Sequence, residues 1–237
     1  YLSNKAYQYH EAQWIKKVIK NENYSSDLRS KFFLDKNHFS LEFAYYTPKE
    51  NLNSEKFSLQ VRIKKEKNIK GMRKFSLMHP KIRQGIYEWL VHQLLRRENL
   101  IALRYSHVNV VINGVNKGIY ALEEGYTKQL LENNGRREGL IVKFEEIKPD
   151  IKIYGESENL IDPQKKSQVL LIKSLYQSWC EGILHSSKLF DYEKMAVYMA
   201  LMHLVDGYHS VAPYNLRFYF NTVTGLLEPI GREFNAH

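Results

Sequence analysis

Four polar residues near the end of the sequence have the types and the spacing that metal or proton chemistry needs. Asp206, His209 and Asn215 follow an apolar run, and Glu233 comes after a segment with the pattern of a β-hairpin. Carboxylate and amide oxygens are ligands that hard divalent cations prefer, and a carboxylate can also accept the proton of a hydroxyl. We therefore interpret Asp206 and His209 as candidate catalytic residues, and Asn215 and Glu233 as candidate metal ligands.

Each of these residues also has an ordinary structural interpretation. His209 can be a hydrogen-bonding histidine, Asn215 the start of a strand, and Glu233 a surface carboxylate. Asp206 can be a helix-end acid, although a negative charge at the carboxyl end of a helix is locally unfavourable. This last point favours a compensating cation near Asp206. Arg217 could bind a phosphate or pair with Glu233, and the sequence does not rank these two roles.

The order of charged residues along the chain matches the requirements of phosphoryl transfer. That reaction needs an acid to orient the attacking hydroxyl, acceptors for Mg²⁺ and a cation at the nucleotide phosphates. Kinase-like folds place these in the order strand lysine, helix glutamate, hinge, catalytic acid and Asn, hairpin, metal acid. The corresponding candidates here are Lys74 or its rival Lys64, Glu88, a hinge at 123–126 with Glu123 and Glu124, then Asp206, Asn215 and Glu233.

Composition indicates a globular, basic protein. The 237 residues carry a net charge of +9, 43% are hydrophobic, and none of the apolar runs reaches the roughly 18 residues of a membrane span. The one cysteine, Cys180, excludes an internal disulfide, and its apolar surroundings predict a buried, inert thiol. Because the sequence starts without Met and ends soon after Glu233, we expect a fragment that is truncated at its C-terminus.

A dense basic run, "RIKKEKNIKGMRK" at 62–74, has three possible roles: a solvated loop, a phosphate-binding loop or a nucleic-acid contact. The sequence contains no zinc finger, RNA-recognition aromatic signature or basic heptad region. We therefore expect no nucleic-acid partner.

Residues 1–150 have mainly strand patterns, with one helix expected to pack on the sheet. Phe57, Leu59, Val61 and Ile63 alternate strictly, which predicts a half-buried strand. The turn signal "NGVNKG" within 106–126 predicts a β-hairpin, because Asn and Gly accept positive φ. The other expected elements are a helix at 9–20, strands at 38–48, 74–80 and 139–146, and helices at 83–98 and 127–134.

Residues 151–237 are predicted to be mainly helical with a late hairpin. Asp162 and Pro163 indicate the start of a helix that extends to about 184, after a polar connection at 151–162. Asp191 is a second N-cap, and Gly207 is expected to close that helix in a left-handed conformation. A strand, a turn at Thr224–Gly225 and a second strand follow. A β-rich region and a helical region together predict an α+β protein with a cleft between two lobes.

Three segments of the sequence resemble the CotH family of spore-coat-type atypical protein kinases: "GMRKFSLMHPKIR", "HVNVVINGVNKGIYALEE" and "DGYHSVAPYNLRFYFNTVTGLLEPIG". The resemblance spans about residues 57–237. It implies a two-lobed protein-kinase-like fold, with a β-rich N-terminal lobe and a mainly helical C-terminal lobe. It also implies ATP with Mg²⁺ or Mn²⁺ as cofactors, and phosphate transfer to serine or threonine hydroxyls of a protein substrate. A bacterial spore coat or another extracytoplasmic location is the expected setting.

Two departures leave other functions open. The family usually has a Trp-Asp-x-Asp-like metal motif where this chain reads "PIGREFNAH", so Glu233 would replace the metal aspartate with a longer side chain. There is also no G-x-G-x-x-G phosphate loop. The alternatives are a catalytically impaired pseudokinase-like module that binds nucleotide or protein, and a hydrolase that uses Asp206 and Glu233 as paired carboxylates.

Overall fold

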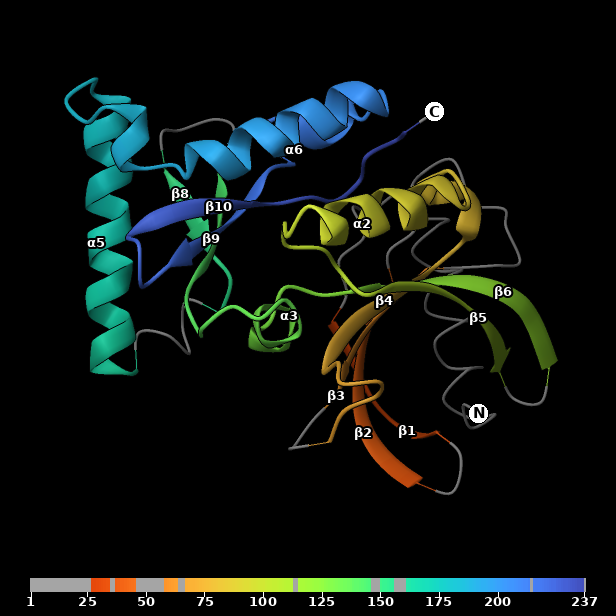
Figure 1. Ribbon diagram of the computed structural model, residues 1–237. Coiled ribbons are helices and arrows are strands. Elements are labelled where there is room, and N and C mark those ends of the chain that lie inside the picture. The colour runs from red at the N-terminus through yellow and green to blue at the C-terminus, as the bar shows by residue number, and fades with distance from the viewer. Residues whose placement is uncertain are drawn as a thin grey trace, which may run out of the picture. The chain divides into compact units, whose positions relative to one another are not determined.

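The described residues form an α+β protein that divides into two units (Figure 1). The computed structural model describes residues 27–34, 37–45, 58–63, 67–112, 115–145, 150–155, 161–213 and 215–236, with backbone alone for 27–45. The first unit comprises Tyr1–Gly85 and Arg104–Gly125, and the second comprises Ile86–Leu103 and Tyr126–His237. Residues 126–150 therefore group with the second unit.

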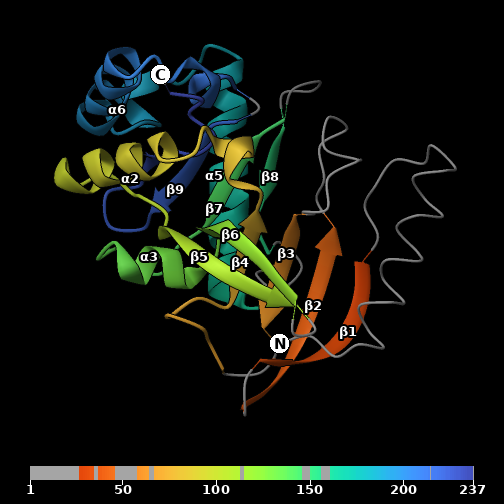
Figure 2. The ribbon, with the colours of Figure 1, turned by 90° about the vertical axis from the view of Figure 1, so that its right-hand side faces the viewer.

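The first unit is built on a six-stranded antiparallel sheet with the order β1-β2-β3-β4-β6-β5 (Figure 2). Its core lies on the face of β3 and β4 where alternate residues are apolar, as the alternation at 57–63 predicts. Leu59, Val61 and Ile63 are all buried there with Phe75 and Leu122. The strands are β1 (Asp27–Leu34), β2 (Asn37–Tyr45), β3 (Leu59–Ile63), β4 (Lys74–Met78), β5 (Tyr105–Ile112) and β6 (Val115–Glu124), and the short 3-10 helix η2 spans Pro80–Arg83.

The second unit is built on a four-stranded antiparallel sheet with the order β10-β9-β7-β8. Helices α2 (Tyr87–Arg97), α3 (Lys128–Asn133), α5 (Pro163–Cys180) and α6 (Tyr192–Leu204) belong to it. Its strands are β7 (Ile141–Phe144), β8 (Ile151–Ile153), β9 (Arg217–Asn221) and β10 (Leu226–Ile230), and its 3-10 helices are η3 (Ser186–Lys188) and η4 (Tyr208–Val211). No helix in the described part of the chain is both long enough and apolar enough to cross a bilayer.

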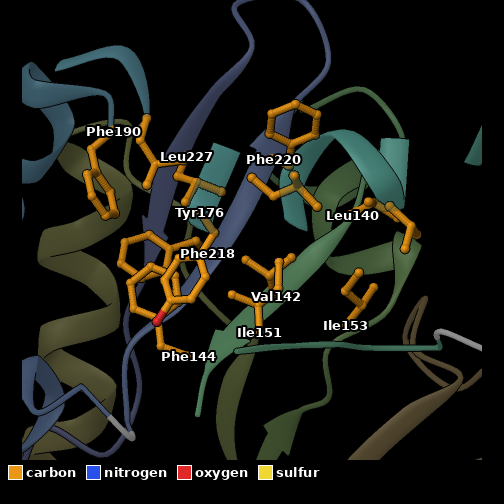
Figure 3. Close-up of a cluster of buried hydrophobic side chains, with 13 residues drawn as sticks. Leu140, Val142, Phe144, Ile151, Ile153, Tyr176, Phe190, Phe218, Phe220 and Leu227 are labelled. Atoms are coloured by element: carbon orange, nitrogen blue, oxygen red, sulfur yellow. The ribbon is translucent and has the colours of Figure 1, made fainter. Parts of the chain in front are cut away.

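Aromatic packing holds α5 against one face of this sheet (Figure 3). The ring of Phe144 on β7 lies 4.8 Å from the rings of both Tyr176 on α5 and Phe218 on β9, measured between centroids. Val169 and Ile172 of α5 are buried in the same cluster. Aromatic pairs at such separations stabilise a core beyond the area they bury.

Two helix starts of the second unit, those of α5 and α6, follow the sequence signals. The Asp162 side chain accepts a hydrogen bond from the Gln164 N–H, with Pro163 at the first helical position. The Asp191 side chain does the same for the Lys194 N–H, and the Lys194 ammonium lies 2.6 Å from its carboxylate. Although burial alone would raise the pKa of Asp191, these contacts hold it below its ordinary value.

Several expectations about local structure were wrong. The polar connection expected at 151–162 contains β8, because Ile151 and Ile153 both enter the core. The long helix ends at Cys180 and not at 184, and the thiol is exposed because Cys180 lies past the buried stripe of α5. The helix expected at 83–98 begins only at Tyr87. The expected helix at 9–20 and the turn residues Asn113 and Gly114 lie outside the described residues.

Candidate active site

Asp206 terminates α6 in a left-handed conformation. The Asp206 N–H bonds the His203 carbonyl at 3.5 Å and the Gly207 N–H bonds the Met202 carbonyl at 2.7 Å, which is the pattern of a Schellman motif. The residue with positive φ (52°) is therefore Asp206, and the expectation that Gly207 would take this role was wrong by one position. A glycine at position 207 has another structural cause, because a Cβ atom added there would lie 3.0 Å from Met202 Sδ.

The segment after Asp206 is fixed by buried hydrogen bonds. Ser210 Oγ donates to the Gly207 carbonyl at 2.8 Å, and the Tyr198 hydroxyl on α6 lies 3.0 Å from Ser210 Oγ. Burial raises the pKa of Tyr198, which keeps its hydroxyl protonated as a donor. At the end of the segment, Asn215 Nδ2 donates to the His209 carbonyl at 2.8 Å. Because this bond uses the amide nitrogen, the amide oxygen of Asn215 can act as an acceptor.

Glu233 follows β10 in a second left-handed conformation, with φ 58°. Its position is set by Glu88 on α2, whose two carboxylate oxygens accept the backbone N–H groups of Glu233 at 2.8 Å and of Phe234 at 3.1 Å. Glu88 and its neighbour His92 are both buried, and the His92 ring meets Phe234 edge-on at 5.1 Å between centroids. A non-glycine residue at positive φ persists where its surroundings impose that conformation, and such residues cluster at functional sites.

The Glu233 side chain lies between two basic groups. His209 Nε2 is 3.9 Å from one carboxylate oxygen and Arg232 Nη1 is 3.4 Å from the other. The second unit thus brings together three of the predicted site residues: Glu233, His209 and, through its bond to His209, Asn215. Asp206 is exposed at the start of the same segment. Arg217 is buried, and its Nε donates to the Tyr154 hydroxyl at 2.6 Å.

Gly231 makes this arrangement possible by its lack of a side chain. An added Cβ would lie 2.7 Å from Phe234 Cε1 and 2.9 Å from Tyr198 Cε2, both of which are fully buried. We expect Gly231→Ala to lower the free energy of unfolding by about 1–3 kcal/mol, because the added methyl overpacks the site. Denaturant unfolding measures this change. An unaltered midpoint would mean that the rings have room to move.

The candidate residues of the first unit are held by two ion pairs. The Arg83 Nε lies 3.2 Å from the Glu123 carboxylate, and Arg104 pairs with the Glu124 carboxylate through two nitrogens. Both carboxylates are buried, so these pairs fix the end of β6. Arg104 also donates to the carbonyls of Lys70 and Gly71, at 3.1 Å each.

The basic run folds into a tight turn at that point. Ile69 and Met72 exchange two backbone hydrogen bonds, and Lys70 and Gly71 between them both have positive φ, as in a type I′ turn. Lys74 opens β4 beyond this turn and is half-buried, and the stem of its side chain packs on Gly125. Lys64 lies outside the described residues.

The side chains of the candidate site suit a metal ion that is coordinated partly by a bound ligand, and not one that is coordinated by protein atoms alone. In the described part of the chain, no group of three or more His, Cys, Asp or Glu side chains is arranged to hold a metal. Mg²⁺ is commonly bound through one or two carboxylates together with substrate phosphates and water. The Glu233 carboxylate and the Asn215 amide oxygen are a donor set that fits this mode.

Sequence reasoning missed the residues that position the site. Glu88 was assigned to a lysine partner, yet its two oxygens hold the backbone at 233–234, and the pairing with Lys74 stays a prediction. Arg83, Arg104 and Arg232 were not singled out. A signal was present for Arg104, because a glutamate in a β-rich run such as "ALEE" needs a cationic partner if it is buried.

Comparison with known proteins identifies a family for the chain. A family model described as CotH kinase protein matches residues 49–228, which is well over half of the chain. The match includes Lys74, Glu88, Asp206 and Asn215 and ends before Glu233. No curated protein matches the sequence significantly.

Proposed function

Because this chain belongs to the CotH kinase family, we propose that it transfers the γ-phosphoryl group of ATP to serine or threonine hydroxyls of a protein. One observation supports this most strongly. The Glu233 backbone is held by Glu88, and its carboxylate lies beside His209 on the segment that runs from Asp206 to Asn215. In this proposal two acidic residues and an amide from separate connections act together, which supports phosphoryl transfer because that reaction depends on positioning.

In this proposal each residue has a separate role. The Asp206 carboxylate accepts the proton of the acceptor hydroxyl while the hydroxyl oxygen forms a bond to the γ-phosphorus. The bond between the γ-phosphorus and the β–γ bridging oxygen breaks, and ADP is released. Asn215 holds His209 through its carbonyl, and His209 orients the Glu233 carboxylate. Glu233 and Asn215 would hold a divalent ion, which when bound neutralises phosphate charge.

The first unit supplies the nucleotide contacts in this proposal. Lys74 and the turn that Arg104 fixes present positive charge for the phosphates. The chain passes from the first unit to the second between Gly125 and Tyr126, directly after β6, and we propose that the backbone at 123–126 contacts adenine. A two-lobed, protein-kinase-like arrangement is part of the same proposal.

Lys74→Ala should weaken ATP binding by roughly tenfold, because a charge-assisted contact to phosphate is lost. If Lys64 is the contact instead, Lys64→Ala should have this effect. Titration calorimetry with ATP measures it, and Lys166→Ala on α5 is the control, since this exposed lysine lies on the other unit. The assignment fails if both Lys74→Ala and Lys64→Ala bind ATP as the wild type does.

A pseudokinase-like nucleotide-binding module is the second candidate. It is favoured by the surroundings of Glu233, because Arg232 and His209 lie near its carboxylate and compete with a metal ion for the carboxylate oxygens. A carboxylate in an ion pair must give up its partner to bind a metal fully.

Thermal unfolding with added ligands separates the candidate functions. A ligand at 100 times its Kd stabilises the folded state by about 2.7 kcal/mol. We expect ATP with Mn²⁺ to raise the midpoint more than either alone, as a kinase requires. A shift with ATP that does not depend on metal supports the pseudokinase, and a shift with oligosaccharides alone supports a hydrolase.

A further inference from the structure

Three basic residues form a continuous row across the sheet of the second unit. Lys143 on β7 pairs directly with Lys152 on β8 on one side and with Arg217 on β9 on the other. Residues directly opposite one another on antiparallel strands point to the same face, with Cβ atoms about 5 Å apart. The three cations therefore share one face, which is opposite to the face that Val142 and Phe218 pack against α5.

This row has an energetic cost that the acids next to its two lysines do not offset. Like charges directly opposite one another destabilise a sheet. Neither Lys143 nor Lys152 forms a hydrogen bond or ion pair through its side chain in the described part of the chain. Glu145 and Asp150 oppose each other two residues further along the strands, but the Asp150 carboxylate accepts the Ile151 N–H at 2.7 Å and pairs with neither lysine.

At one end of the row, Arg217 packs on aromatic rings. The Arg217 guanidinium lies over the rings of Tyr126 and Tyr154, at 5.8 and 6.0 Å from their centroids. Arg232 lies over the same Tyr126 ring at 5.9 Å. Exposure rises along the row, because Arg217 is buried, Lys143 is half-buried and Lys152 is exposed. With strands about 4.8 Å apart, the row spans about 10 Å.

We propose that this row binds acidic side chains of the protein acceptor. The identification of the ligand as an acceptor rests on the proposed function. The N–H groups of the strands form the hydrogen bonds of the sheet, so this surface lacks the free backbone N–H groups that hold nucleotide phosphates. It offers instead the positive charges of lysine side chains with flexible stems. Such stems can follow carboxylates at varied positions. Arg217 lies two residues after Asn215, so a segment bound here runs beside the proposed catalytic segment.

A binding experiment without nucleotide tests this site. The probe is a fluorescein-labelled, glutamate-rich peptide without Ser, Thr or Tyr, and fluorescence anisotropy gives its Kd. We expect Lys143→Glu/Lys152→Glu to bind at least about tenfold more weakly than the wild type, and the wild-type affinity to fall as salt is raised. The matched control is Lys166→Glu/Lys188→Glu, which makes the same charge change at two exposed lysines outside this sheet face.

The outcomes are distinguishable from those of the proposed function, because the peptide has no hydroxyl acceptor and no ATP is present. Equal weakening in the control pair would mean attraction by net charge alone and would overturn the proposal. Absence of wild-type binding, or displacement of the peptide by ATP, would overturn it as well. Lys143→Gln/Lys152→Gln repeats the test without charge reversal, should the Glu variants fail to fold.

Discussion

The Asp206→Asn variant is expected to bind ATP as the wild type does and to transfer phosphate about 100-fold more slowly, or slower still. The substitution keeps the shape of the side chain and removes its ability to accept a proton. Asn also tolerates positive φ, so the Schellman motif at the end of α6 should survive. The loss should therefore appear in kcat and not in nucleotide affinity.

Rates of label transfer from ATP, together with calorimetric Kd values for ATP, measure the two effects separately. Asp162→Asn is the matched control, because this exposed aspartate is an N-cap and Asn caps a helix equally well. Transfer at the wild-type rate by Asp206→Asn would remove Asp206 from the catalytic role. Loss of ATP binding in the same variant would assign Asp206 to the nucleotide.

Glu88→Ala is expected to be the most destabilising of the substitutions in the site. It leaves two backbone N–H groups at 233–234 without their acceptor, and each unsatisfied buried group costs about 1–3 kcal/mol. Release of this segment should also move Glu233 away from His209. Glu88→Gln keeps one acceptor oxygen and should lose about half as much free energy of unfolding.

Denaturant unfolding gives the loss of stability, and amide hydrogen exchange locates it. Protection at Glu233 and Phe234 should fall in both Glu88 variants before it falls elsewhere in the second unit. Glu98→Ala is the control, because Glu98 ends the same helix and is exposed. Unchanged protection at 233–234 in Glu88→Ala would show that these hydrogen bonds do not hold the segment.

Strand β3 and the starts of α5 and α6 could be predicted from local patterns because each has a local cause. Strict alternation at 57–63 and the hydrogen-bonding side chains of Asp162 and Asp191 need no tertiary information. The short strand β8 could not be found this way. Its three residues reveal their alternation only when Ile151 and Ile153 meet the core formed by α5.

The site could be predicted only in part, for a similar reason. The residue types and the order of Asp206, Asn215 and Glu233 can be read from the sequence, and so can the family resemblance. The hydrogen bond from the Glu233 N–H to the Glu88 carboxylate joins residues 145 positions apart, and no local pattern encodes it. The left-handed position of Asp206 was also missed, because glycine is the usual residue there and Gly207 stands next to it.

Transfer of labelled γ-phosphate from ATP to a serine-rich protein, by the full-length protein with Mg²⁺ or Mn²⁺, tests the central claim most directly. The wild type should label serine or threonine in the acceptor, and the Asp206→Asn variant should do so at about one hundredth of that rate or less. A wild-type protein that binds ATP and transfers no phosphate would contradict the claim and establish the pseudokinase instead.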